Sequence, residues 1–342
     1  YAGRPSHPVG VAMADTVARF ALPKRWFDDL LEGIEFSPSG YSVEYGRRNG
    51  GLIDSRLRVP RANERWNGYV EANAFHAGFL IRGPIGDDTN IAIAGRRSYI
   101  DGILAALPDN LLPLTVAPRY YDGQVKLDHR FSSRFSGTLL LFGSDDELRA
   151  VLDEPPAAFP DARGDISSGI TFGGGIATLR YEGKSFRYKS TFAYVPNKIT
   201  AAVGDALSFD LTNAEVTIRQ RLSFGTRDIK MRAGIDWLWN GYDISLRLPS
   251  GTTTGERGGA QNTNVNPNDT AQAGSFYSPA VWADAVLKPV KGLELVAGAR
   301  LDFFRQYVER DGGRVVNRID NTVTPRVNAR FKATEDVTLK AA

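Results

Sequence analysis

The chain has 342 residues, of which 35 are glycine, and apolar residues make up 42%, which is low for a soluble globular domain. It has no cysteine and three scattered histidines, so disulfide bonds, a cysteine-based metal site and a three-histidine metal site are excluded. A formal net charge of +3 is too small to indicate a nucleic-acid partner. No apolar run approaches about 18 residues, so the sequence predicts no membrane-spanning helix.

The first fifty residues differ in pattern from the rest of the chain. Trp26–Phe36 has mixed character and leads into a glycine-rich stretch that ends in the pair Gly50 and Gly51. Paired glycines permit a sharp turn where the chain passes from one part of the fold to the next. The opening residues lack the basic and apolar regions of a signal peptide, so we expect the chain to begin inside a longer precursor.

Alternation of apolar and polar residues dominates the remainder. Between residues 229 and 239 every odd position is apolar, from Ile229 to Trp239, and most positions between them are polar. A strand directs successive side chains to opposite faces, so this pattern predicts one apolar and one polar face. Comparable segments are expected at 66–83, 115–131, 134–143, 170–182, 186–194, 215–223, 281–288, 292–309 and 323–331. The polar face carries Lys230, Arg232, Arg300, Arg326, Arg330 and Lys332, which we expect to point into an interior.

The connections between these segments are expected to alternate in length. Short connections with turn-forming residues lie at 86–90, 132–134, 182–185, 225–228, 290–292 and 333–336, and longer ones near 60–65, 102–114, 145–163, 196–208, 248–276 and 310–319. Short turns at one end and long loops at the other are typical of outer-membrane barrels. Several strands also exceed the usual length in soluble sheets, and aromatic residues gather near their ends.

These patterns predict an all-β transmembrane antiparallel barrel, of which about 12 complete strands and the start of a thirteenth are present. A tall soluble β-protein remains the alternative, because soluble sandwiches alternate as well. Plugged outer-membrane barrels use about 22 strands, so the chain would supply roughly half of a wall.

One segment also resembles a known family. The order Ile34, Glu35, Pro38, Gly40, Tyr41, Tyr45, Gly46, Gly50, Gly51 resembles the junction between plug and barrel in TonB-dependent outer-membrane receptors. Phe79–Asp101 is similar to the second hairpin of that family. The resemblance implies that residues 1–49 are the C-terminal part of a plug and that residues 50–342 are the N-terminal portion of the barrel, with Leu52–Val59 as its first strand. It assigns the junction to Pro38, Gly40, Tyr45, Gly46, Gly50 and Gly51. The chain departs from the family in lacking a TonB box, most of the plug and a terminal aromatic residue.

Other candidate sites have plainer explanations. Gly183-Lys184-Ser185 lacks the first glycine of a phosphate-binding loop and fits a hairpin turn. Gly173–Gly175 fits a bulge, a bend or a close contact within a strand. Asp128 and His129 have no suitable serine nearby, so a strand-end histidine is the expectation. Two polar loops could hold Ca²⁺ but are better explained as solvated outer loops. One is the segment Gln261–Asp269. The other carries the acidic residues Asp145, Asp146, Glu147, Asp153, Glu154, Asp161 and Asp165. No catalytic, cofactor or metal site is expected, and no ligand-binding residue is assigned.

Two functions remain open at this point. The resemblance implies active transport of a scarce solute (a metal chelate, glycan or peptide) across the bacterial outer membrane, driven by the inner-membrane proton gradient through a TonB-type energy-coupling protein. The other is a non-transporting surface protein for adhesion, motility or secretion that uses the same plugged barrel. Both imply outer-membrane lipid and lipopolysaccharide as neighbours, and neither implies an enzyme.

Overall fold

A computed structural model describes residues 31–37, 41–47, 51–57, 65–105, 116–152, 164–204, 207–226, 228–248, 268–310, 314–334 and 337–341. Almost all of these residues lie in strands. Within this part of the chain the helical content is a single short element, α3 (Ile100–Ala105). No helix described there is long and apolar enough to cross a membrane.

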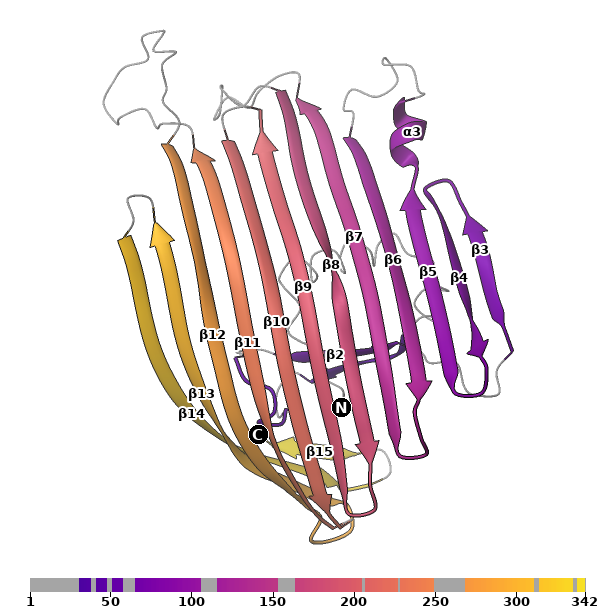
Figure 1. Ribbon diagram of the computed structural model, residues 1–342, viewed down its shortest axis with the longest axis vertical. Coiled ribbons are helices and arrows are strands. Elements are labelled where there is room, and N and C mark those ends of the chain that lie inside the picture. Colours follow the sequence, from indigo (N-terminus) through magenta and orange to yellow (C-terminus); the bar gives the residue numbers. More distant parts are fainter. Residues whose placement is uncertain are drawn as a thin grey trace.

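The main element is one 13-stranded sheet in which each strand pairs antiparallel with the next along the chain. Its strands are β3 (Asn67–Ala72), β4 (His76–Ile85), β5 (Thr89–Ser98), β6 (Val116–Arg130), β7 (Phe135–Leu152), β8 (Gly164–Glu182), β9 (Phe186–Val203), β10 (Leu207–Gly225), β11 (Ile229–Leu248), β12 (Asn268–Leu287), β13 (Leu293–Arg310), β14 (Arg314–Lys332) and β15 (Thr338–Ala341). The sheet curves into an open wall (Figure 1). The expected all-β architecture is confirmed.

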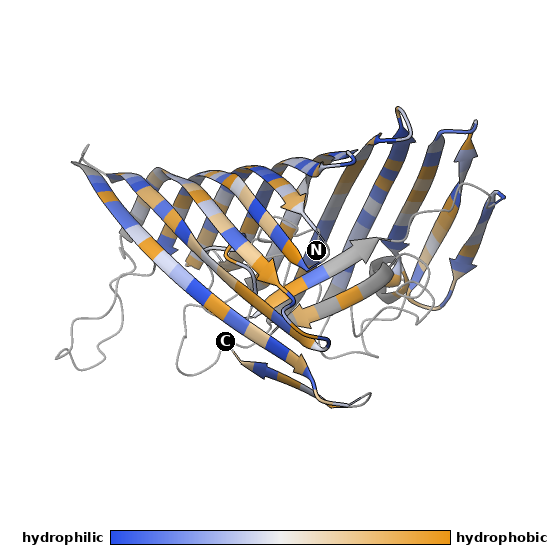
Figure 2. Ribbon diagram, turned by 90° about the horizontal axis from the view of Figure 1, so that it is seen from below, coloured by the Kyte–Doolittle hydropathy of each residue, from blue (hydrophilic) through white to orange (hydrophobic). Residues whose placement is uncertain are grey.

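Two further strands form a separate small sheet. β1 (Leu31–Ser37) pairs antiparallel with β2 (Leu52–Leu57), and this hairpin lies across the concave side of the wall (Figures 1 and 2). The expectation that Leu52–Val59 is the first wall strand is therefore wrong. Within the described residues β2 pairs with β1 alone, and the 13-stranded sheet begins with β3.

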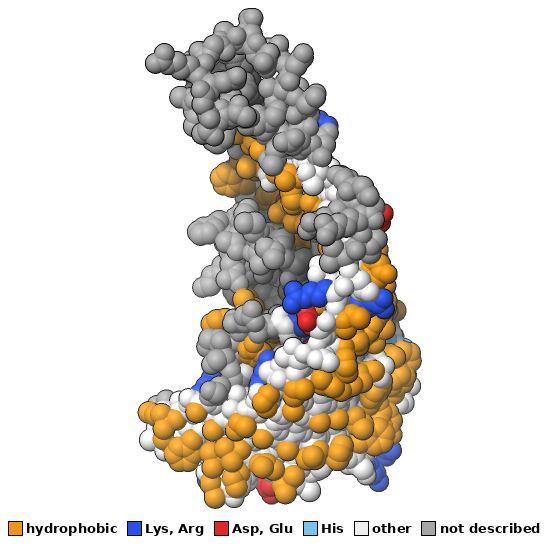
Figure 3. Space-filling view, turned by 90° about the vertical axis from the view of Figure 1, so that its left-hand side faces the viewer, with side chains coloured by type: hydrophobic (Ala, Val, Ile, Leu, Met, Phe, Trp, Pro, Cys, Tyr) orange, Lys and Arg blue, Asp and Glu red, His pale blue; other side chains and the backbone are white. Residues whose placement is uncertain are grey.

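The two faces of the wall have opposite chemistry, as Figure 2 shows by the alternating colours along its strands. Ile235, Val281, Leu301 and Val323 lie side by side across β11–β14 on the convex face. Apolar side chains on this face are half exposed, with Ile235 at 46% and Val281 at 49%. Figure 3 shows such side chains covering much of the surface. Soluble monomers rarely expose apolar patches larger than a few hundred Å², so this face is suited to hydrocarbon rather than to water.

The concave face has the reverse composition. Its most deeply buried side chains include Arg300, Asp236, His76 and Ser278. Charged groups of this kind are almost never fully buried in a soluble core unless they are paired, so the burial on this side depends on polar contacts. The alternation of faces that the sequence predicts is confirmed.

The connections differ in length between the two ends of the wall, as expected, but the difference is smaller than the sequence predicts. All connections at one end are short, and long ones at 99–115, 153–163 and 249–267 lie at the other. Three expectations at that end are wrong. Segment 66–83 is not one strand but a hairpin that turns at residues 73–75, and the connections 204–206 and 311–313 are as short as those opposite.

Candidate functional site

Residues 41–47, which we call the inner turn, lie against the concave face of β10–β14. The backbone amide of Tyr45 donates to the carbonyl oxygen of Ser42 at 3.0 Å, and the amide of Glu44 donates to the Ser42 hydroxyl at 3.2 Å. Arg47 has a φ of 57°, in the left-handed region that few residues other than glycine adopt. The turn is compact, and its middle residues Val43, Glu44 and Tyr45 are each at most 3% exposed.

The centre of the contact is one carboxylate that meets three guanidinium groups. Asp236 Oδ2 accepts from Arg47 Nη2 at 2.7 Å, from Arg300 Nη2 at 2.9 Å and from Arg219 Nη2 at 3.4 Å. Asp302 adds a second carboxylate, whose oxygens lie 2.9 Å from Arg300 Nε. We call these five residues the Asp236 cluster. Because Arg47 belongs to the inner turn and the others to wall strands, the cluster ties the two together.

A second ion pair anchors the beginning of the turn. Arg232 binds Asp284 with two parallel hydrogen bonds, from Nε at 2.6 Å and from Nη2 at 2.7 Å. The Ser42 hydroxyl donates to Asp284 Oδ2 at 2.7 Å. Asp284 is buried, and the bidentate pairing with Arg232 compensates its charge while Asp284 accepts the hydrogen bond from the turn.

The backbone of the turn is held by further arginines. Arg326 Nη1 donates to the carbonyl oxygens of Tyr45 at 2.8 Å and Ser42 at 3.2 Å. Arg300 Nη1 donates to the carbonyl oxygen of Glu44 at 2.9 Å, and Arg221 Nη1 lies 3.2 Å from the Glu44 carboxylate. A buried carbonyl oxygen without a hydrogen-bond partner is costly. The arginines therefore supply the hydrogen bonds that water would make to an exposed turn.

Two residues of the expected junction lie in this contact. An added Cβ at Gly46 would sit 2.2 Å from Arg300 Nε, so only glycine fits without displacement. The ring of Tyr45 lies beneath the Arg219 guanidinium, 5.3 Å from its centre. Burial, together with the carboxylate of Glu44, raises the pKa of the Tyr45 hydroxyl, which therefore stays neutral. Gly51 is exposed next to β2. The remaining junction residues, Pro38, Gly40 and Gly50, lie outside the described residues, and the junction role of the set stays a prediction.

The polar face predicted from sequence is brought partly into the site. Arg232, Arg300 and Arg326 contact the inner turn, whereas Lys230, Arg330 and Lys332 have no such contact among the described residues. Sequence reasoning missed Arg219, Arg221 and Asp284 as members of the contact. The same two-residue alternation would have placed them on the inner face, but nothing in the sequence says which inner positions meet the turn.

The remaining candidates are structural. Gly183–Ser185 connects β8 and β9, with the Gly183 amide donating to the Phe186 carbonyl at 2.9 Å, so the hairpin interpretation is confirmed. His129 lies at the end of β6, 2.8 Å from the Thr89 hydroxyl. The acidic residues Asp145, Asp146 and Glu147 belong to β7 and not to a loop as expected, because β7 continues to Leu152. No group of three possible metal ligands occurs within the parts of the chain that the structure covers.

Apolar convex rows and a polar concave face that holds an inner segment by ion pairs are together typical of outer-membrane β-barrels. The family comparison makes this specific. Residues 98–342 match the TonB dependent receptor-like β-barrel family, and the chain belongs to that family. Its outer-membrane location follows. No curated protein matches the chain in sequence.

Solved structures share the fold. The ferric citrate transporter FecA in its unliganded form is 12% identical to this chain, with a TM-score of 0.65. The match covers 91% of this chain and 49% of FecA. The siderophore receptor PiuA from Acinetobacter baumannii is 14% identical with a TM-score of 0.61, covering 90% and 53%. The ferric yersiniabactin uptake receptor FyuA from Yersinia pestis is 12% identical with a TM-score of 0.59, covering 85% and 48%. The chain thus spans about half the length of these receptors. The family that residues 98–342 match is one of receptors, in agreement with the expectation that the chain is not an enzyme.

Proposed function

We propose that this chain is part of an outer-membrane receptor that actively takes up a scarce solute. In this proposal residues 1–49 end a plug. The barrel wall begins with β3 at Asn67 and not at residue 50 as expected, because Leu52–Leu57 pairs with β1. The observation that carries it is the inner turn, a segment on the concave side of a membrane-type wall. Five strands hold this turn through ion pairs and hydrogen bonds. Membership of the receptor family supports the same function.

The work of transport must come from outside the outer membrane, which has no ATP. A TonB-type protein that reaches the plug would deliver energy from the inner-membrane proton gradient, about 2.3 kcal/mol for each charge per 100 mV. Removing one partner of a buried ion pair costs about 3–5 kcal/mol. Releasing the inner turn would break its Arg47–Asp236 and Glu44–Arg221 pairs together, which would exceed what one or two charges supply. The inner turn is therefore the fixed end of the plug, and the moving part lies closer to the N-terminus.

The solute is proposed as a metal chelate first, with a glycan or a peptide as the other classes. The support is the function of the structural neighbours, which include a ferric yersiniabactin uptake receptor and a ferric citrate transporter. Their identity of 12% shows the fold alone, so the choice among the three classes rests on experiment.

The test is uptake of radiolabelled ferric chelates, oligosaccharides and peptides by cells with and without the gene. We expect accumulation of one class to require the gene and to stop when a protonophore collapses the inner-membrane gradient. Uptake that persists after the gradient collapses would contradict active transport. Unchanged uptake of every class would favour the non-transporting surface protein.

A further inference from the structure

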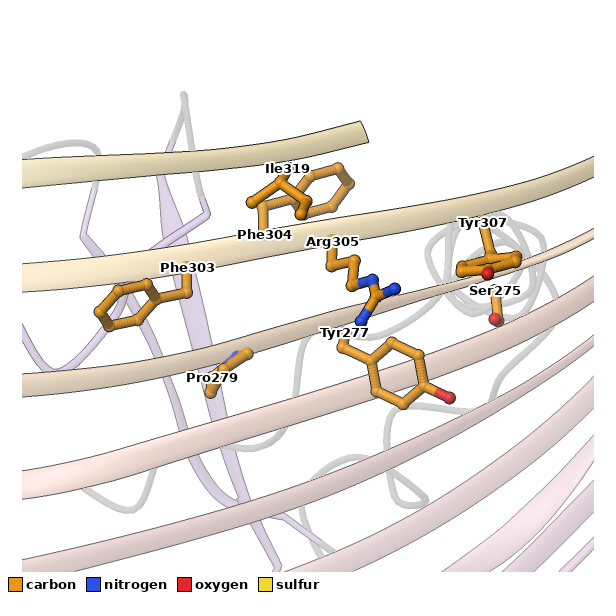
Figure 4. Close-up of a pocket in the computed structure, with 8 residues that line it drawn as sticks. All are labelled: Ser275, Tyr277, Pro279, Phe303, Phe304, Arg305, Tyr307 and Ile319. Carbon is orange, nitrogen blue, oxygen red and sulfur yellow. The ribbon is translucent and has the colours of Figure 1, made fainter. Parts of the chain in front are cut away.

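The convex face carries a groove that the transport function does not use. It has a volume of about 590 Å³ and lies over β12, β13 and β14 (Figure 4). Apolar and aromatic side chains form most of its lining, including Tyr277, Phe303, Tyr307 and Ile319. Arg305 is the one charged residue among those that line it.

Arg305 is held loosely by its own chain. Its Nε donates to Asn317 Oδ1 at 3.3 Å, and its guanidinium lies 5.5 Å from the centre of the Tyr307 ring. Within the described residues neither of its terminal nitrogens has a hydrogen-bond partner or an ion pair. Figure 4 shows the side chain lying between Tyr277 and Tyr307. Several donors of a permanent cation are therefore directed at whatever fills the groove.

The position of Arg305 along the strand fixes its depth in the membrane. On β13 the convex face is uncharged from Leu295 through Leu301 and Phe303, and Arg305 follows. Ten residues of a strand tilted by about 45° rise about 23 Å, close to the roughly 25 Å apolar band of such barrels. Arg305 therefore lies where the hydrocarbon ends, on the side of the long connections.

The neighbours of Arg305 support this depth. The same row across the wall contains Trp239, Tyr277 and Ile319. Tryptophan and tyrosine concentrate at the level of the lipid headgroups. Since the long loops of outer-membrane barrels face outward, this row marks the outer leaflet.

We propose that Arg305 and the surrounding groove bind a phosphorylated glycolipid of the outer leaflet. The guanidinium pairs with a phosphate oxygen, and Arg is suited to this because its planar donors match phosphate geometry. The acyl chains lie along the apolar rows below, against Phe303 and Leu301. The simpler alternative, in which Arg305 only extends into headgroup water, requires no groove and no preference for phosphate.

The test uses the full-length protein in detergent and measures bound lipid A by native mass spectrometry. We expect Arg305→Gln to reduce retention of bisphosphorylated lipid A about tenfold, with partial rescue by Arg305→Lys. Fully dephosphorylated lipid A should bind the original protein as weakly as bisphosphorylated lipid A binds Arg305→Gln. Inorganic phosphate should fail to displace the lipid, because the groove also holds its acyl chains.

Arg318→Gln is the matched control. Arg318 lies at the same end of the neighbouring strand β14, pairs with Asp320 at 2.6 Å and has a 69% exposed side chain on the opposite face. This variant should retain lipid A like the original protein. Equal retention by Arg305→Gln and the original protein, or equal binding of phosphorylated and dephosphorylated lipid, would overturn the proposal.

Discussion

Gly46 stands where the inner turn leaves no space for a side chain, because an added Cβ would lie 2.2 Å from Arg300 Nε. Its absent side chain leaves room for Arg300, which is 1% exposed and held by Asp236, Asp302 and the Glu44 carbonyl. Because Arg300 has no free direction in which to move, Gly46→Ala should destabilise the protein by about 1–3 kcal/mol, as overpacking does. The temperature of unfolding in detergent measures this. Gly102→Ala in α3, where an added Cβ meets nothing within 4 Å, should leave that temperature unchanged or raise it.

Asp236 balances more positive charge than any other single residue of the contact. Asp236→Asn should leave buried guanidinium groups uncompensated and cost about 3–5 kcal/mol at the contact. Hydrogen exchange of residues 41–47 should accelerate, while exchange in β6 and β7 stays slow. Asp320→Asn, which removes a half-exposed partner of Arg318, is the control and should change neither. Equal protection of the inner turn in both variants would show that it is held by something other than the Asp236 cluster.

Strand β11 illustrates how the two faces of one element differ. Ile235 is on the convex face, whereas Lys230 is on the concave face and has no ion pair among the described residues. Ile235→Arg should cost about 2–4 kcal/mol at the middle of the bilayer and reduce the amount of assembled protein in the outer membrane. Lys230→Ala should assemble at the original level. A larger defect for Lys230→Ala would mean that the faces are assigned the wrong way round.

The accuracy of the predicted elements follows from how local their signals are. The alternating segment 229–239 lies within β11, as expected, because every odd position in it is apolar. The prediction of a single strand at 66–83 was wrong because the turn within it contains no glycine or proline. Instead the Asn73 side chain accepts from the amides of Phe75 at 2.8 Å and His76 at 3.0 Å. Such side-chain capping depends on conformation and is hard to distinguish from an ordinary polar position in a strand.

Proline caused the opposite error at 196–208, which we expected to be a loop. Pro196 lies inside β9, opposite Ala214 of β10. On its other side the pairing with β8 is interrupted at Gly173 and Gly174, and Gly174 has a φ of 147°. A proline lacks an amide hydrogen, so it is tolerated in a strand where a ladder bond is missing. The glycines and the proline lie more than twenty positions apart, so their compensation appears only in the folded sheet.

For the whole molecule, the sequence predicts the wall better than the site. Alternation is set by each strand alone, so it predicts which residues face inward, including Arg232, Arg300 and Arg326. The contact with the inner turn brings Glu44 to Arg221 and Ser42 to Asp284, across 177 and 242 positions. No local pattern encodes such pairs. The pairing of β2 with β1 was missed for the same reason. Either the wall or the small sheet could supply hydrogen-bond partners for the backbone of β2, and no local pattern decides between them.

The convex face of the wall should meet hydrocarbon and the concave face should enclose polar groups. Strand β9 offers the most direct test of this arrangement. The chain has no cysteine, so single cysteines from 188 to 194 can each carry a spin label in a bilayer. We predict strong relaxation by dissolved oxygen at positions 188, 192 and 194, and weak relaxation at 189, 191 and 193, where Thr191 and Ala193 are buried. Strong relaxation at 189, 191 and 193 instead, or no alternation at all, would contradict the account.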